Sequence, residues 1–177
     1  SVAFVACVGN DAYGAEAIRA YQTEGIDVAY IRRDANLPTG TAAIVVDDAA
    51  ENYIIAVPGA NAALTPDDVR RATPAIQKAQ VILSQLETPL EATLEAFTLA
   101  RTAGVLTMLT PAPAMELPNE LFRLCDVCVP NKTELERLAG TSCHNRSEVQ
   151  AAANRLRSRG VRIVVVTMGR SGALLFD

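Results

Sequence analysis

Short apolar runs alternate along this chain with segments whose apolar residues recur at helical spacing. The runs are rich in valine, isoleucine and leucine, and they lie at residues 2–8, 81–83, 105–109, 127–129 and 163–166. Strands that are hydrophobic at every position are typical of a parallel sheet with two buried faces. The alternation therefore predicts an α/β fold, in which a mostly parallel sheet is flanked by helices on both faces.

Capping residues and glycines mark where the predicted helices begin and end. Thr65-Pro66-Asp67-Asp68 and Thr88-Pro89-Leu90-Glu91 are typical helix starts, because a threonine side chain can cap the first turn and acidic residues favour its dipole. A glycine ends each of the helices predicted at residues 13–24, 88–103, 133–139 and 147–159. These boundaries place helices between buried strands, as a parallel sheet requires.

The segment around residue 50 breaks this alternation. Residues 41–46 and 53–57 are two β-rich runs on either side of the polar stretch 47–52, which is typical of a β-hairpin with a long loop. With 177 residues and a mass of 18.8 kDa, the chain has the length of one ordinary domain. We expect a single α/β domain over residues 1–177, with the hairpin inside residues 39–61.

Composition and charge exclude several classes of partner. The net charge of −4 and the pI near 5.1 disfavour a nucleic-acid partner, whose phosphates attract basic surfaces. Arg155, Arg157 and Arg159 form a light basic cluster, which we interpret as the solvated face of a helix. No apolar run approaches the roughly 20 residues of a membrane-spanning helix, so we expect no membrane partner either.

Two of the four cysteines allow two interpretations. Cys125 and Cys128 form a C-x-x-C motif, which could bind zinc or act as a redox pair. A zinc site needs further ligands, for which only Cys143-His144 and the distant Cys7 are candidates. We favour small buried side chains of an apolar strand. Reduced thiols, and an N-terminus without the basic region of a signal peptide, predict a cytoplasmic protein.

Polar residues follow several of the predicted strands directly. Right-handed crossovers place the carboxyl ends of parallel strands along one edge of the sheet, where α/β proteins bind ligands. Glu87, Pro111, Asn131 and Thr167 each lie just past such an end. We therefore expect the functional site at this edge.

The residues alone leave two interpretations for each candidate. Glu87 could accept charge-assisted hydrogen bonds from sugar hydroxyls, or it could favour the dipole of the helix that follows. Asn131 and Glu134 share one face of a helix start and could bind a ligand or simply cap the helix. The glycines of residues 167–172 could let a ligand approach the backbone, or they could form a plain tight turn.

Five motifs occur in a fixed order: Pro58-Gly59-Ala60-Asn61, Gln85-Leu86-Glu87, Pro111-Ala112-Pro113-Ala114, Pro130-Asn131-Lys132-Thr133-Glu134 and Thr167-Met168-Gly169-Arg170-Ser171-Gly172. In this order they resemble the central part of the ribokinase-like family of sugar and nucleoside kinases. The resemblance implies an ATP-dependent phosphotransferase that converts D-ribose and ATP to D-ribose 5-phosphate and ADP. Fructose, 2-keto-3-deoxygluconate and nucleosides are the alternative acceptors.

The resemblance also implies roles for individual residues. It places the sugar against Glu87 and Asn61, although Asn61 could equally be a turn residue. It places ATP against Asn131 and the residues Thr167, Met168, Gly169, Arg170, Ser171 and Gly172. Glu134 and Asn131 would organise Mg²⁺ through water. The hairpin would act as a lid over the sugar and as the surface of a homodimer.

Some features depart from the family. Lys132 stands where glutamate is usual, and Thr110 replaces an asparagine. In Gly9-Asn10-Asp11-x-x-Gly14, which we interpret as a structural turn, Asn10 replaces an aspartate.

Two family segments are not among these residues: an N-terminal glycine-rich segment and a C-terminal Gly-Ala-Gly-Asp motif that supplies the catalytic base. The usual ligands of an activating monovalent cation also lie toward that C-terminal motif. The resemblance thus implies a kinase domain incomplete at both ends, with no catalytic residue in this chain and negligible turnover by it alone. The alternative from another class is a non-catalytic protein that binds a sugar or a nucleotide.

Overall fold

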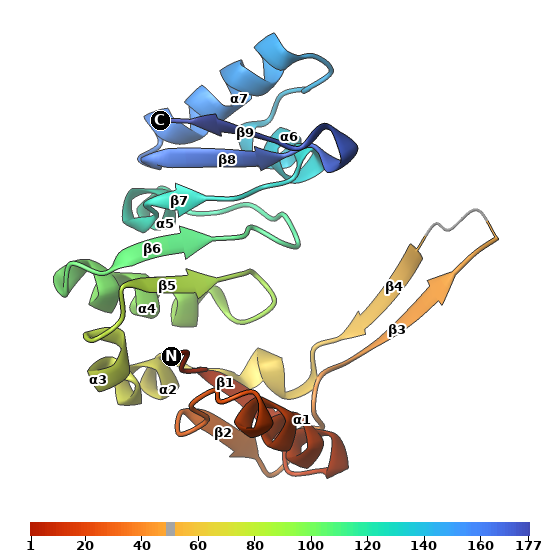
Figure 1. Ribbon diagram of the computed structural model, residues 1–177, viewed down its shortest axis with the longest axis vertical. Coiled ribbons are helices and arrows are strands. Elements are labelled where there is room, and N and C mark those ends of the chain that lie inside the picture. Colours follow the sequence, from red (N-terminus) through yellow and green to blue (C-terminus); the bar gives the residue numbers. More distant parts are fainter. Residues whose placement is uncertain (49–51) are drawn as a thin grey trace. The chain divides into compact units, whose positions relative to one another are not determined.

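The computed structural model describes residues 1–48 and 52–177, which form two compact units (Figure 1). The first unit contains residues 1–72 and 87–92, and the second contains residues 73–86 and 93–177. The polar stretch 47–52, predicted as the loop of the hairpin, lies partly outside the described residues.

A parallel strand pair forms the base of the first unit. Strand β1 (Ala6–Gly9) leads into helix α1 (Ala12–Thr23), and β2 (Ile31–Asp34) then pairs with β1 in parallel. The strand predicted at residues 2–8 thus begins later in the structure. The residues of β2 are mostly polar, and they form a strand because they pair with β1. A search for hydrophobic runs cannot detect a strand of this kind.

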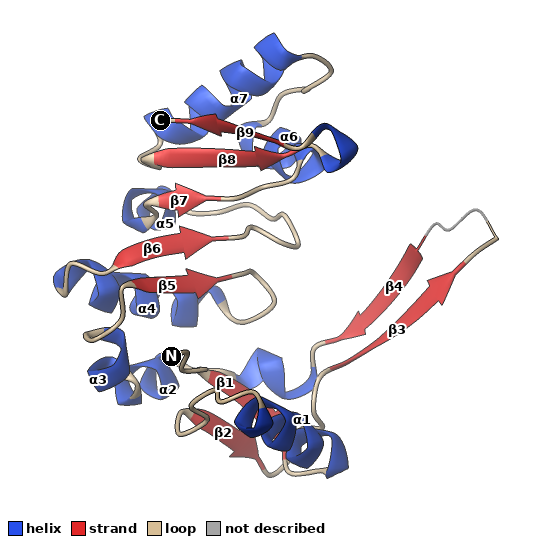
Figure 2. Cartoon of the chain, viewed as in Figure 1, coloured by secondary structure: helices blue, strands red, loops and turns tan. Residues whose placement is uncertain are grey.

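An antiparallel hairpin follows, as predicted. Its strands are β3 (Thr41–Val46) and β4 (Asn52–Val57). The short 3₁₀ helix η1 (Gly59–Ala63) and helix α2 (Pro66–Arg71) come next in the chain. Within this unit, no helix lies along either described strand of the hairpin (Figure 2).

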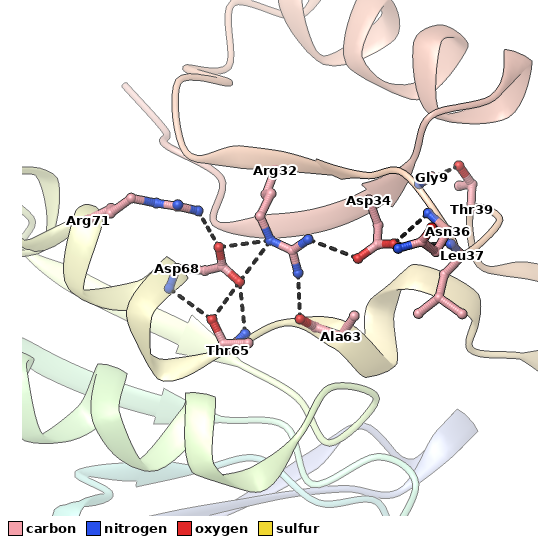
Figure 3. A network of polar contacts seen from close by, with 10 residues as sticks. All are labelled: Gly9, Arg32, Asp34, Asn36, Leu37, Thr39, Ala63, Thr65, Asp68 and Arg71. Carbon is pink, nitrogen blue, oxygen red and sulfur yellow. Dashed lines mark hydrogen bonds and ion pairs between the residues drawn. The ribbon is translucent and has the colours of Figure 1, made fainter.

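A buried carboxylate joins β2 to α2 (Figure 3). Asp68 is only 2% exposed, and both of its oxygens accept from Nε of Arg32, at 3.0 and 3.1 Å. It also completes a capping box with Thr65, whose backbone N–H and hydroxyl both donate to it at 2.9 Å. The other nitrogens of Arg32 donate to Asp34 and to the carbonyl of Ala63. Every branch of the guanidinium is therefore engaged.

A five-stranded sheet organises the second unit. Its strands are β5 (Val81–Ser84), β6 (Leu106–Leu109), β7 (Val127–Cys128), β8 (Ile163–Thr167) and β9 (Ala173–Phe176), in that spatial order (Figure 1). The first four are parallel, and β9 turns back antiparallel to β8. The helices of this part of the chain are α3 (Thr73–Ile76), α4 (Leu90–Thr102), α5 (Asn119–Leu124), α6 (Lys132–Ala139) and α7 (Arg146–Ser158).

The register of this sheet divides its side chains between two faces. Leu109, Cys128 and Val164 are register partners on one face and are completely buried. On the opposite face, Leu83 is 63% exposed and Leu175 is 61% exposed. Because β5 to β8 are neighbours in chain order, right-handed crossovers carry the intervening helices to the same face. The predicted α/β class with a mostly parallel sheet is confirmed, but among the described residues helices cover one face of this sheet rather than the two expected.

Arg159 corrects the interpretation of the arginine cluster. The guanidinium carbon lies 4.0 Å from the centre of the Phe122 ring, where a cation–π contact is favourable. The same group donates to the carbonyls of Leu117 and Leu138. Arg159 is therefore held against the protein surface rather than solvated, because its partners come from segments far away in the sequence.

The cysteines are buried free thiols, all within the described residues, which confirms our interpretation of Cys125 and Cys128. The Cys125 thiol donates to the carbonyl of Val127 at 3.2 Å. Contact with Cys125, together with burial, raises the pKa of Cys128 and keeps that thiol protonated. In the described part of the chain, no group of three or more His, Cys, Asp or Glu side chains is arranged to hold a metal ion.

The Asp68 network should set the stability of the first unit. Asp68→Ala leaves Arg32 without its buried partner and is expected to lower the free energy of unfolding by on the order of 3 kcal/mol. Burial alone would raise the pKa of Asp68, but the hydrogen bonds from Thr65 and Arg32 outweigh it and hold the pKa below 3.8. The stabilisation is therefore complete above the unfolded pKa and is lost as pH falls through the folded one.

Urea unfolding of the wild type and Asp68→Ala at several pH values measures both effects. The difference between the two proteins should shrink as pH falls below about 4. Asp67→Ala is the matched control, because the adjacent carboxylate is exposed and contributes little. Equal stability of the two alanine variants at neutral pH would contradict the role assigned to Asp68.

Candidate functional site

The carboxyl ends of β5 to β8 meet at one edge of the sheet in the second unit. Backbone hydrogen bonds continue past the strand ends, from Thr110 N to Ser84 O at 2.9 Å and from Thr167 N to Pro130 O at 3.0 Å. An isolated parallel bridge pairs Asn131 with Thr167. The loops that follow neighbouring strands therefore lie side by side at this edge.

Asn131 and Glu134 bind each other at the start of α6. The backbone N–H of Asn131 donates to one carboxylate oxygen of Glu134 and its side-chain amide donates to the other, both at 2.8 Å. In return, the Glu134 N–H donates to the Asn131 side-chain oxygen at 2.8 Å. This is a capping box, one of the two interpretations that the sequence left open. A carboxylate oxygen that accepts one hydrogen bond keeps a second lone pair, so capping does not prevent ligand binding.

Residues 167–172 form a tight turn between β8 and β9. Met168 N donates to Gly172 O at 2.8 Å, and Gly169 and Gly172 have φ angles of 55° and 83°. A Cβ atom at either glycine would meet nothing within 4 Å. Positive φ rather than crowding thus explains both glycines. Thr167, Arg170 and Ser171 are exposed, and they leave this turn open beside Asn131.

The two residues expected at the sugar belong to the first unit. Glu87 is exposed and directly follows Leu86, which is buried in the second unit. Asn61 lies in η1 at the base of the hairpin, where its side-chain nitrogen is 2.7 Å from the position a Cβ atom on Gly40 would occupy. Asn131, Glu134 and residues 167–172 belong to the second unit.

Hydrogen bonds between Asp11 and Thr39 at the base of the hairpin could not be recognised from the sequence. One oxygen of Asp11 accepts from the Thr39 hydroxyl at 2.6 Å and the other accepts from Thr39 N at 2.8 Å. Asp11 also caps α1 through Gly14 N, which supports the interpretation as a structural turn. These bonds, led by the one from the Thr39 hydroxyl, lower the pKa of Asp11. Asp11 in an N-cap position was the available signal, but nothing in the pattern indicated Thr39 as its partner.

Most described residues of the hairpin strands are apolar, and apolar side chains are exposed on both faces. The register places Ala42, Ile44, Val46, Ile54 and Ala56 on one face, and Ala43, Val45, Tyr53, Ile55 and Val57 on the other. Ile44 is 63% exposed and Ile55 is 65% exposed. Contiguous exposed apolar surface is typical of interaction sites.

Two cavities among the described residues are lined by other side chains. One, of about 330 Å³, is lined by Ala29, Tyr30, Ile31, Arg32 and Arg71. The other, of about 340 Å³, is lined by residues that include Met115, Arg137 and Arg159. Neither contains a residue predicted for the site. Within the described residues, every helix is too short or too polar to cross a bilayer.

Comparison with known proteins gives a consistent result. The family model described as pfkB family carbohydrate kinase matches residues 1–177. The chain is 39% identical over 169 residues to a ribokinase of Staphylococcus aureus. This alignment covers 96% of the chain and 56% of the relative. It is 37% identical over 168 residues to a deoxyribokinase of Salmonella typhi, in an alignment that covers 94% of the chain and 55% of the relative.

Solved structures agree with the sequence relatives. The ribokinase of Arabidopsis thaliana, solved in complex with ribose and ATP, superposes with a TM-score of 0.87 at 30% identity and covers 98% of this chain and 57% of that one. The ribokinase of Thermotoga maritima superposes with a TM-score of 0.85 at 34% identity, over 99% of this chain and 56% of that one. The chain therefore spans about half the length of the relatives it matches.

Proposed function

The chain belongs to the pfkB family of carbohydrate kinases, and we propose from this membership that the whole protein transfers the γ-phosphoryl group of ATP to a hydroxyl group of a sugar. The observation that carries the proposal is the adjacency of Asn131 and the turn 167–172 at the ends of β7 and β8. Phosphoryl transfer depends mainly on positioning and on stabilising the charge of the phosphate oxygens. Exposed backbone beside a polar helix start suits that task.

D-Ribose is the proposed acceptor, and D-ribose 5-phosphate is the product. Several relatives of 36–39% identity are ribokinases, and one ribokinase structure contains ribose and ATP. The deoxyribokinases at 37% identity support 2-deoxy-D-ribose as the second candidate. Fructose, 2-keto-3-deoxygluconate and nucleosides remain acceptors to be compared in the same assay.

Each binding residue has a proposed task. Glu87 accepts charge-assisted hydrogen bonds from sugar hydroxyls. Asn61, at the base of the hairpin, contacts the same sugar. The backbone of residues 167–172 lines the nucleotide, and Asn131 orients its phosphates. None of these groups is a general base, so we expect the 177 residues alone to bind ligands without measurable turnover.

Asn131 and Glu134 have the chemistry of a Mg²⁺ site that acts through water. Mg²⁺ prefers oxygen ligands and keeps several of its own waters, so one carboxylate and one amide oxygen can act from beyond those waters. When bound with ATP, Mg²⁺ neutralises charge on the phosphate oxygens. A monovalent cation is a further proposed activator, for which these residues offer no separate site.

The hairpin is proposed as a lid over the sugar and as the contact surface of a homodimer. Two apolar faces suit two different tasks, because one face can exclude water from a sugar while the other packs on a second copy. The protein is proposed to act in the cytoplasm on small molecules, without nucleic acid or membrane partners.

Replacing Glu87 tests the sugar site. Glu87→Gln should raise the KM for D-ribose about tenfold and leave the KM for ATP unchanged, because a neutral amide forfeits a charge-assisted bond worth on the order of 1–2 kcal/mol. The measurement is ADP release by the full-length protein with ribose, deoxyribose and fructose.

Glu91→Gln is the matched control, since Glu91 is exposed in the first turn of α4. It removes the same charge from the same helix start. An unchanged ribose KM in Glu87→Gln would show that Glu87 serves the helix dipole instead.

Glu134 allows capping to be separated from metal binding. Glutamine is also accepted at the third position of a capping box, so Glu134→Gln should keep the stability of the wild type. The same variant should bind Mg²⁺–ADP about tenfold more weakly, while Glu134→Ala also loses about 1 kcal/mol of stability. Isothermal titration with and without Mg²⁺ gives the affinities, and thermal unfolding gives the stabilities. Wild-type Mg²⁺–ADP affinity in Glu134→Gln would leave Glu134 with a capping role only.

The dimer proposal is tested by charging each face of the hairpin in turn. Ile44→Lys and Ile55→Lys are made as separate single variants, one on each face. Only the variant on the face that packs on the second copy should raise the dissociation constant of the dimer, at least tenfold, because its charge must be buried without a partner. Sedimentation equilibrium over a range of concentrations measures this constant. A wild-type protein that stays monomeric at about 100 μM, well above typical homodimer dissociation constants, would refute the proposal.

A further inference from the structure

The peptide group between Gln85 and Leu86 lies one residue before Glu87 and is held at both ends. The carbonyl of Gln85 accepts a hydrogen bond from the Ser84 hydroxyl at 3.2 Å. The N–H of the same peptide, which belongs to Leu86, donates to the carbonyl of Ala112 at 3.0 Å. The Leu86 side chain is buried. The held peptide plane and the buried Leu86 side chain together restrict the direction in which the chain enters Glu87.

A second hydroxyl completes this arrangement. Ser84 Oγ lies 3.1 Å from Oγ1 of Thr93, which is 3% exposed in the second turn of α4. A hydroxyl has one proton to donate. Since Ser84 donates its proton to Gln85, Thr93 must be the donor to Ser84. The bonds therefore form a directed chain from Thr93 through Ser84 to the Gln85 carbonyl.

The sheet explains why the two hydroxyls meet. Ser84 is the register partner of Leu109, whose side chain is completely buried on the helix-covered face. The Ser84 side chain thus points toward the face on which α4 packs, where Phe97 and Ala100 are completely buried as well. A polar pair in such surroundings is costly unless both members are hydrogen-bonded, which makes its geometry specific.

We infer that Thr93 and Ser84 are positioning residues for the sugar site, because their hydroxyl chain fixes the Gln85–Leu86 peptide from which Glu87 extends. The inference rests on the proposed role of Glu87 in binding the sugar. Neither residue needs to touch the sugar. Thr93 acts through Ser84, and Ser84 acts through the peptide.

The test removes the first hydroxyl while keeping the shape of the side chain. Thr93→Val is expected to raise the KM for D-ribose about fivefold in the full-length protein and to leave the KM for ATP within twofold. Amide hydrogen exchange at Leu86, followed by NMR, should become about tenfold faster, because Ser84 without Thr93 is no longer held toward the Gln85 carbonyl and its bond to this peptide weakens. Thr93→Ser restores the hydroxyl and should return both values to within twofold of the wild type.

Thr107→Val is the matched control. Thr107 is completely buried on the same face of the sheet, in the neighbouring strand β6, and its hydroxyl donates to the carbonyl of Leu124 instead. Its replacement should cost stability without changing the ribose KM or the exchange at Leu86. If Thr93→Val does not fold, Ser84→Ala interrupts the same chain one step later and is measured in its place.

Three results would overturn the inference: a ribose KM unchanged in Thr93→Val, an equal rise of the ribose and ATP KM values, or the same effects in Thr107→Val. Failure of the proposed function gives a different result. A wild-type protein that neither binds nor phosphorylates D-ribose refutes the function, and the exchange at Leu86 still decides whether the two hydroxyls hold the peptide.

Discussion

Backbone hydrogen bonds between parallel strands do not stop where β5 to β8 end. They continue into the loops, so that residue 110 pairs with residue 84 and residue 167 pairs with residue 130. Each loop is thereby held in register with its neighbour before any side chain contributes. The candidate nucleotide site depends on this constraint, because Asn131 and the turn 167–172 come together only through it. Loops held by a rigid sheet can present polar groups precisely enough to bind a phosphate.

The polar groups at this edge serve the fold and are proposed to serve the ligand as well. Asn131 and Glu134 complete each other's hydrogen bonds and begin α6. A carboxylate fixed in this way loses little further conformational freedom when a ligand binds. The entropy cost of ordering it therefore subtracts little from the binding free energy. Ser84, at the end of β5, and Thr93, in α4, likewise serve the fold and are inferred to serve the sugar site. A side chain that caps a helix is therefore not excluded from a functional site.

The first unit depends on a different kind of interaction. Arg32 and Asp68 are partly or fully removed from water, yet each of their charges is matched by several partners (Figure 3). Close backbone packing accompanies this network: a Cβ atom on Gly59 would lie 2.4 Å from the Pro38 carbonyl oxygen. Only glycine, which also adopts the φ of 51° found there, fits at this crossing. The two arms of the hairpin are thus held together at its base while its described strands stay exposed.

Much of this could be read from the pattern of residues, because the deciding interactions are local. Threonine and asparagine caps, acidic first turns and glycine stops act within one turn of helix, and the buried strands appear as continuous apolar runs. The hairpin at 41–57 and the capping box at Asn131 follow from such signals. The order of strands along the chain also predicted an edge where the loops after them would gather.

Other features depend on segments that lie far apart in the chain. The sequence suggests that Arg159 is solvated, whereas in the structure it contacts Phe122 and Leu117. It likewise does not show that Thr39 hydrogen-bonds Asp11. The one-sided helical cover of the five-stranded sheet likewise follows from the order of strands in space, which apolar runs do not report. The sequence by itself determined the hairpin, the motifs of the site and most of the helices and apolar strands, because caps, glycines and periodicity are short-range physics. Only the tertiary structure decided which distant side chains complete each other's hydrogen bonds. Those contacts are set by how the elements pack, and the distance between two residues in the sequence does not show whether they will touch.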